Sequence, residues 1–115
     1  MSYVIETSAH FDREAKRLRK RYKSFAEDLR QFVEGISKSP LQGTELTPGI
    51  RKIRMTITSK GGGKSGGARV ITANAIVAEQ EGRIAFLYIY DKADASNVKM
   101  NVIKKIAHDM GYETK

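Results

Sequence analysis

The spacing of apolar residues changes from a helical to a strand period along this chain, and this change restricts its possible folds more than any other feature. Two stripes with the period of an α-helix lie in the first third. They are formed by Phe11, Ala15, Leu18 and Tyr22, and then by Phe25, Leu29, Phe32, Val33 and Ile36. Ser24 and Glu27 have the spacing of a capping box, in which each side chain binds the backbone amide of the other. We therefore expect two helices joined by a tight turn, a helical hairpin.

Strand-like alternation begins after a loop that we expect at residues 41–49. Ile53, Met55 and Ile57 alternate with polar residues, and a second strand is predicted at residues 69–77. The segment 61–67 between them is too rich in glycine to hold a helix and is expected to be a loop. After a turn at 79–82, residues 84–90 are apolar on both faces, which is typical of a central strand.

The order of these segments predicts the fold class. Residues 3–5 indicate a short edge strand, and a last helix is expected with Ser96 as its cap, an apolar side from Val98 to Met110, and Gly111 at its end. Helices that precede a run of antiparallel strands indicate an α+β domain, here one domain over residues 1–115. We expect the helical hairpin on one face of a small, mainly antiparallel sheet, which leaves the other face free to line a shallow site.

Positive charge is concentrated in the middle of the chain. The net charge is +8, and there is no Asp or Glu from Leu46 to Ala78. The cations of that span are Arg51, Lys52, Arg54, Lys60, Lys64 and Arg69. A surface that gathers like charges without carboxylates repels itself unless an anion binds there, and a phosphodiester backbone is the leading candidate.

Strand geometry predicts that four cations converge. Lys52 and Arg54 are two residues apart in a strand, so both point away from the helical hairpin. If the glycine-rich segment closes a hairpin, Arg69 returns beside them. Lys92 follows the next predicted strand and can complete the cluster. The sequence therefore predicts a cationic site that draws on three strands.

The glycine-rich segment and its neighbours supply further candidates. Its Gly-Lys-Ser sequence at 63–65 is similar to the end of a P-loop, but phosphate-binding loops of that kind run into a helix, and this segment runs into a predicted strand. We expect instead that Lys60 and Lys64 close over a polyanion, that Arg51 adds a contact, and that Tyr90 is placed to stack on a base.

Other classes of site find little support. There is no cysteine, and His10 and His108 have no carboxylate partner at a metal-binding spacing, so we expect neither a metal ion nor another cofactor. The absence of cysteine fits a reducing cytosol, and the first residues lack the pattern of a secretion signal. No apolar run approaches the about 20 residues that cross a bilayer, so we expect a cytoplasmic protein without a membrane partner.

Several blocks of sequence resemble a known family. They are Gly49…Lys52-Ile-Arg54, Gly63-Lys-Ser-Gly-Gly-Ala-Arg-Val-Ile71 and Leu87-Tyr-Ile-Tyr-Asp-Lys92, with the helical stripe of residues 11–22. The chain thereby resembles the RelE/HigB group of bacterial type II toxins, within the RelE/ParE superfamily, over nearly all of its length. The resemblance implies a small ribonuclease that cleaves mRNA in the ribosomal A site. It also implies a cognate antitoxin that binds and blocks it, as a hetero-oligomer.

The resemblance assigns roles to the cations. Family catalytic residues correspond to Lys52, Arg54, Arg69 and Lys92. Ala93 stands where studied RelE members carry an arginine, and residues 98–100 stand where they carry a tyrosine. The histidines that HigB members use are also absent from this chain.

Metal-free cleavage of RNA requires the 2′-hydroxyl to attack the adjacent phosphorus in line. Neighbouring positive charges disfavour the protonated form of a lysine, so Lys52 suits the general base, and Lys92 suits the acid. The forked guanidinium groups of Arg54 and Arg69 suit the phosphorane oxygens. Two alternatives stay open: a gyrase poison of the ParE branch, and a non-catalytic regulator that binds RNA or the ribosome.

Overall fold

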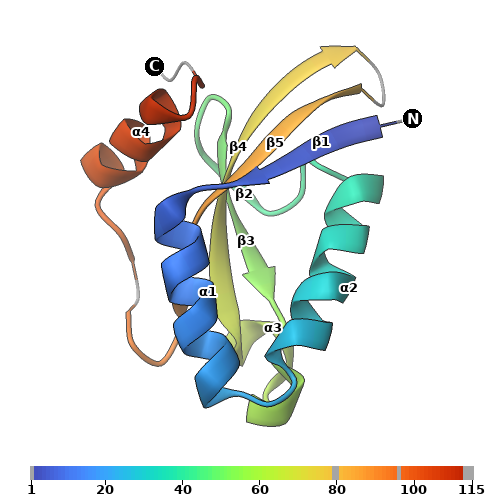
Figure 1. Ribbon diagram of the computed structural model, residues 1–115, viewed down its shortest axis with the longest axis vertical. Helices are drawn as coiled ribbons and strands as arrows, with labels where there is room; N and C mark the ends of the chain where they lie inside the picture. Colours follow the sequence, from blue (N-terminus) through green and yellow to red (C-terminus); the bar gives the residue numbers. More distant parts are fainter. Residues whose placement is uncertain (1, 79–80, 96, 113–115) are drawn as a thin grey trace.

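An open sheet with helices on both faces forms the framework of the protein (Figure 1). The computed structural model describes residues 2–78, 81–95 and 97–112, without the side chains at 2, 64, 76–78 and 81. Over these residues the elements are, in order, β1 (Ser2–Thr7), α1 (Ala9–Arg21), α2 (Phe25–Lys38), β2 (Thr44–Thr47), β3 (Ile50–Met55), the 3₁₀ turn η1 (Thr58–Lys60), α3 (Gly63–Gly66), β4 (Ala68–Ala78), β5 (Glu81–Asp91) and α4 (Met100–Asp109).

The strand order within the described residues is β1-β5-β4-β3-β2. β1 pairs with β5 in parallel, and the other neighbours are antiparallel, so the prediction of a mainly antiparallel sheet is confirmed. β1 lies at an edge, as expected. β5 lies between β1 and β4 and buries residues on both faces, which explains its unbroken apolar sequence.

The helical hairpin of α1 and α2 covers one face of the sheet, as predicted. Phe86 of β5 is the centre of this core, with its ring centroid 5.4 Å from that of Phe11 in α1 and 5.6 Å from that of Phe32 in α2. Tilted and edge-on rings at this separation are the favoured arrangements of aromatic pairs. Ile53 and Met55 of β3 point into the same core.

The opposite face is only partly open, because α4 packs on it (Figure 1). Ile103, Ile106 and Ala107 of α4 form a second core with residues of β3, β4 and β5. The expectation that this whole face is free was therefore wrong, since the apolar side chains on it require a cover of their own. The open part is the end of the sheet at which β3 finishes.

Two serines begin helices, in different ways. Ser8 is the N-cap of α1: its Oγ accepts from the Phe11 amide at 2.9 Å and donates to the Leu87 carbonyl at 2.6 Å. The capping box predicted for Ser24 and Glu27 was wrong. Ser24 has helical backbone angles and no side-chain cap bond. Its hydroxyl instead donates to Asp28 and accepts from the Ser59 amide, which ties α2 to η1.

Short elements were missed where glycine and proline dominate the sequence. The predicted loop at 41–49 contains β2, and the glycine-rich segment contains the single helical turn α3. The predicted turn at 79–82 is also too long, since Glu81 and Gly82 are already in β5, while 79 and 80 lie outside the described residues.

The last helix starts later than predicted. Lys99 is its N-cap, Val98 precedes it, and the proposed cap Ser96 lies outside the described residues. Gly111 follows its C-cap with φ of 89°, a conformation that glycine adopts without strain, and this stop is confirmed.

Candidate functional site

An open cleft of about 660 Å³ lies on the face of the sheet opposite α1 and α2. It is lined by Gln42, Gly43, Thr44, Leu46, Lys52, Ile53, Arg54, Arg69 and Lys92. All four cations that the sequence predicted to converge are in this lining. Its other members are uncharged.

Strand register places the four cations. Lys52 and Arg54 alternate along β3 with residues of the helix-covered core, so both point to the cleft. Arg69 of β4 is the direct cross-strand partner of Arg54. Lys92 follows β5, and its amide donates to the Gly67 carbonyl at 3.0 Å, which holds the chain beside the start of β4.

Arg69 is the buried member of the cluster, with 7% of its surface exposed. Its Nη1 donates to the Ala68 carbonyl at 3.2 Å, and its Nη2 donates to the Ser65 carbonyl at 3.0 Å. These two bonds hold the Arg69 guanidinium in place at the base of the cleft.

Three cations of the cluster have no anionic partner within the part of the chain that the structure describes. Lys52, Arg54 and Lys92 form neither an ion pair nor a side-chain hydrogen bond there. This contrasts with other cations of the protein, such as Arg30, whose guanidinium contacts both Glu27 and Glu34. Three cations without an anionic partner among the described residues create a positive potential in a concave site, and such a site attracts anions.

The strand β2, which sequence analysis missed, supplies the second wall of the cleft. Thr44 and Leu46 alternate along it, and both reach the lining. Gly43 is required at its start. Its φ is 76°, and a Cβ there would lie 2.2 Å from the Lys52 carbonyl oxygen. The Thr-Glu-Leu-Thr alternation was the available signal, but it is too short to separate from a loop.

The lining of the cleft does not include three further residues that the sequence predicted to contact RNA: Arg51, Lys60 and Tyr90. Arg51 is on the helix-facing side of β3, where its Nε donates to the Gln42 carbonyl at 2.7 Å and braces the segment before β2. The Lys60 amine pairs with Asp91 at 2.5 Å. Tyr90 is buried in the core under α4. For Lys64 the backbone lies in α3, but the side chain lies outside the described part of the chain.

A smaller hollow lies next to the cleft. It has a volume of about 270 Å³ and shares Gln42 and Arg54 with the cleft. Its far side is formed by α2 and by the residues that lead into η1. Its lining adds the carboxylate of Asp28 to side-chain amides and hydroxyls, so the cation cluster without a carboxylate belongs to the cleft alone.

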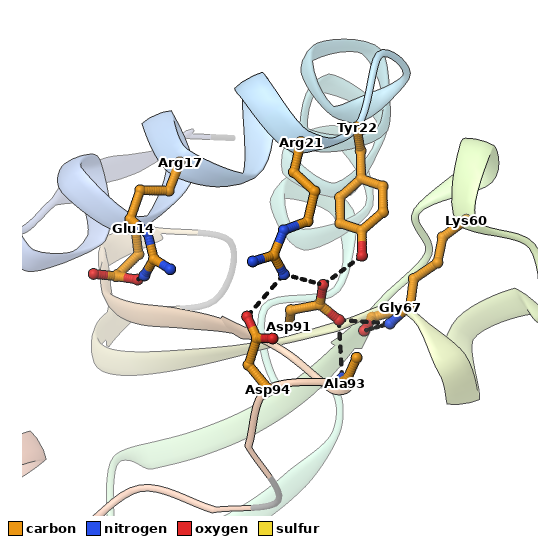
Figure 2. A network of polar contacts seen from close by, with 9 residues as sticks. All are labelled: Glu14, Arg17, Arg21, Tyr22, Lys60, Gly67, Asp91, Ala93 and Asp94. Carbon is orange, nitrogen blue, oxygen red and sulfur yellow. Dashed lines mark hydrogen bonds and ion pairs between the residues drawn. The ribbon is translucent and has the colours of Figure 1, made fainter.

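Asp91 is the residue near this site for which sequence analysis assigned no role. It ends β5 directly before Lys92, is buried, and accepts hydrogen bonds from three side chains (Figure 2). The available signal was an acid next to a cluster of cations. The sequence could not show that this acid is buried behind the cluster.

The histidines stand apart from the cleft. His10 is exposed on α1, where its Nδ1 contacts Arg13, and His108 is exposed on α4. Among the described residues, no group of three or more His, Asp or Glu side chains is arranged to hold a metal ion. In the same part of the chain, no helix combines the length and the apolar character needed to cross a membrane.

A family model described as the RelE toxin of the RelE/RelB toxin-antitoxin system matches residues 5–113. The matched region includes every residue that lines the cleft. No curated protein matches the chain.

Proposed function

The chain belongs to the RelE toxin family of toxin-antitoxin systems, and on that premise we propose that it is an endoribonuclease that cuts mRNA on the ribosome and thereby arrests translation. The observation that carries the proposal is the cleft in which Lys52, Arg54, Arg69 and Lys92 meet without a carboxylate in the lining. A phosphodiester is the anion that best fits an open groove with several fixed positive charges.

The reaction consistent with these groups is transfer of the phosphoryl group to the neighbouring 2′-oxygen. The 2′-hydroxyl loses its proton to the side-chain amine of Lys52 as its oxygen bonds to phosphorus. The bond from phosphorus to the 5′-oxygen breaks, and that oxygen takes a proton from Lys92. The products are a 2′,3′-cyclic phosphate and a free 5′-hydroxyl.

The two arginines have the chemistry for the charge that develops in between. Two negative oxygens on the phosphorane are stabilised by donors that are already in place before the reaction. Arg54 and Arg69 are direct neighbours across β3 and β4, so their guanidinium groups can reach one phosphate together. The ribosome would supply the in-line geometry, which is worth up to about 7–11 kcal/mol in oriented reactions.

The antitoxin partner that the family implies also fits the charge of the protein. A toxin with a net charge of +8 attracts an acidic partner over a distance. We infer that a cognate antitoxin neutralises the toxin by lying over the cleft or by blocking its access to the ribosome. The proposed substrate and partner both place the protein in the cytoplasm.

The decisive experiment is a cell-free translation reaction with purified protein, followed by mapping of mRNA 5′ ends. Arg54→Ala is the best variant, because Arg54 is exposed and forms no side-chain hydrogen bond or ion pair with the described residues. We expect codon-phased cuts with the unmodified protein and a rate about 10²-fold lower with Arg54→Ala. Lys38→Ala is the matched control: it removes an exposed cation that lines neither hollow, and should cut normally.

Other outcomes identify the alternatives. Inhibited translation without cuts would support a binder of RNA or the ribosome. Unaffected translation would direct attention to DNA gyrase, as for the ParE branch. Equal cutting by Arg54→Ala and the unmodified protein would remove the cleft from the reaction.

A further inference from the structure

The carboxylate of Asp91 is the centre of a polar network behind the cleft (Figure 2). Its side chain is fully buried. The donors are Lys60 Nζ at 2.5 Å, Tyr22 OH at 2.6 Å, the Ala93 amide at 2.9 Å and Arg21 Nη1 at 3.0 Å. These donors come from the end of α1, from η1 and from the turn after β5, so one carboxylate joins three segments that are distant in sequence.

The donors of this network stabilise the charged form of the Asp91 carboxylate. Burial by itself raises the pKa of Asp91, but the hydrogen bonds from Lys60, Tyr22, the Ala93 amide and Arg21 outweigh it and hold the pKa well below its ordinary value. A buried charge is tolerated only where it is paired and hydrogen-bonded. If the charge were removed, Lys60 and Arg21 would each lose a partner at the same point.

One branch of the network leads to Lys92. The Asp91 side chain accepts from the Ala93 amide, and the Asp91 carbonyl accepts from the amides of Asp94 and Ala95 at 3.0 and 3.2 Å. The Lys92 amide donates to the Gly67 carbonyl at 3.0 Å. The backbone on both sides of Lys92 is therefore fixed, and its side chain leaves a rigid turn toward the cleft.

A second branch leads to Arg69. Lys60 Nζ binds the Gly67 carbonyl at 3.4 Å in addition to Asp91. Lys60 and Gly67 are the two ends of the segment that contains α3, so their contacts hold this segment closed. Within it, the Ser65 carbonyl accepts from Arg69 Nη2 at 3.0 Å. The same carboxylate thus supports the backbone that orients the buried arginine of the cleft.

We propose that Asp91 is a positioning residue for the cleft: it fixes Lys92 through the turn after β5, and Arg69 through Lys60 and the segment 61–67. The inference rests on the proposed ribonuclease function and adds a residue that does not itself touch the RNA. Because the Lys60 amine binds Asp91, the proposal also assigns Lys60 a positioning role in place of a contact with RNA.

The test separates rate from binding. Asp91→Asn keeps the shape of the side chain and removes its charge. At a temperature where the variant is folded, we expect its kcat for ribosome-dependent cleavage to fall about 10²-fold while KM stays within a factor of about two, because misplacing catalytic groups by about 1 Å has an effect of that size. Glu6→Gln is the matched control, since Glu6 also accepts from an arginine and a tyrosine, Arg83 and Tyr112, but contacts no residue of the cleft. It should leave kcat unchanged.

A double-variant cycle shows whether Asp91 acts through Lys92. Residues that act as a unit have effects that do not multiply. The combined loss in Asp91→Asn/Lys92→Ala should therefore be much smaller than the product of the two separate losses. Multiplying losses, or an unchanged kcat in Asp91→Asn, would overturn the proposal.

If Asp91→Asn does not fold, the variant Lys60→Gln tests the positioning role in its place. A lower kcat with unchanged KM supports positioning, whereas a higher KM with unchanged kcat would make Lys60 an RNA contact and overturn the proposal. Hydrogen exchange of the Lys92 and Ala93 amides is independent of cleavage. If the unmodified protein cuts no RNA, the proposed function fails, but hydrogen exchange still tests the positioning role of Asp91. Faster exchange of the two amides in Asp91→Asn or Lys60→Gln, but not in Glu6→Gln, supports that role. Exchange at the same rate as in the unmodified protein overturns it.

Discussion

At the scale of single residues, the cleft keeps two like charges directly opposite each other. Arg54 and Arg69 are cross-strand partners on the same face of the sheet, and like charges in this arrangement destabilise a sheet. We expect Arg54→Thr to raise the free energy of unfolding by about 0.2–1 kcal/mol, since it removes the repulsion and leaves a residue that favours strands. Urea unfolding at low ionic strength measures the gain.

Salt and a matched variant identify the cause of that gain. Screening weakens repulsion between exposed charges, so the advantage of Arg54→Thr should shrink at high salt. Lys38→Thr removes an equal charge from the end of a helix, α2, where the residue is not paired with another cation across two strands. It should give no comparable gain in the free energy of unfolding. A stability loss in Arg54→Thr at low salt would mean that Arg54 contributes more through its contacts than it costs through repulsion.

At the scale of elements, the close approach of β3 and β4 depends on Gly67. It is buried directly before β4, and a Cβ there would lie 2.1 Å from the Met55 carbonyl oxygen. Gly67→Ala must push the two strands apart where Arg54 and Arg69 pair. We expect a loss of about 1–3 kcal/mol in unfolding free energy, the usual range for an overpacked site, together with reduced activity. Chemical denaturation and the cleavage reaction measure the two effects.

Gly66 provides the control for this prediction. It is the neighbouring residue, in α3, and a Cβ there would be 3.7 Å from the Gly61 carbonyl oxygen, an ordinary contact. Gly66→Ala should leave stability almost unchanged. Equal losses in the two variants would show that the flexibility of the glycine-rich segment, and not the close approach of the strands, makes glycine necessary.

At the scale of the whole molecule, Tyr112 joins the segment directly after α4 to β1 and β5. Tyr112 is buried, its hydroxyl donates to Glu6 at 2.9 Å, and Arg83 lies 4.8 Å from the centre of its ring. Burial and the hydrogen bond to Glu6 raise the pKa of Tyr112 to about 12. The neutral hydroxyl is therefore favoured in the folded protein.

This raised pKa makes stability depend on alkaline pH. An unfolded tyrosine loses its proton near pH 10, about two units before the folded one, so the contribution of Tyr112 is complete below about pH 10 and is lost as the pH rises toward 12. Tyr112→Phe should be less stable at neutral pH and should lose less stability over that interval. Unfolding free energies at several pH values test this, and parallel curves for the two proteins would contradict it.

Sequence alone predicted the parts of the fold that depend on local period. The stripes of α1 and α2, the alternation in β3 and the doubly apolar β5 each show which side chains must be buried, because a helix and a strand expose their faces at different intervals. The convergence of Lys52, Arg54 and Arg69 followed from the same rule, since residues two apart in a strand share a face and a hairpin brings the next strand back beside it.

Only the tertiary structure decided the features that depend on contacts between distant segments. β2 is a strand because β3 lies beside it, and α4 covers a sheet face that the sequence left open. Lys60 belongs to the same run of cations as Lys52, yet it faces a buried carboxylate 31 residues away in sequence. Charge and period are properties of a residue and its neighbours along the chain, so the sequence showed which cations are candidates for the cleft. Which of them are free to meet a ligand depends on partners that only folding brings together.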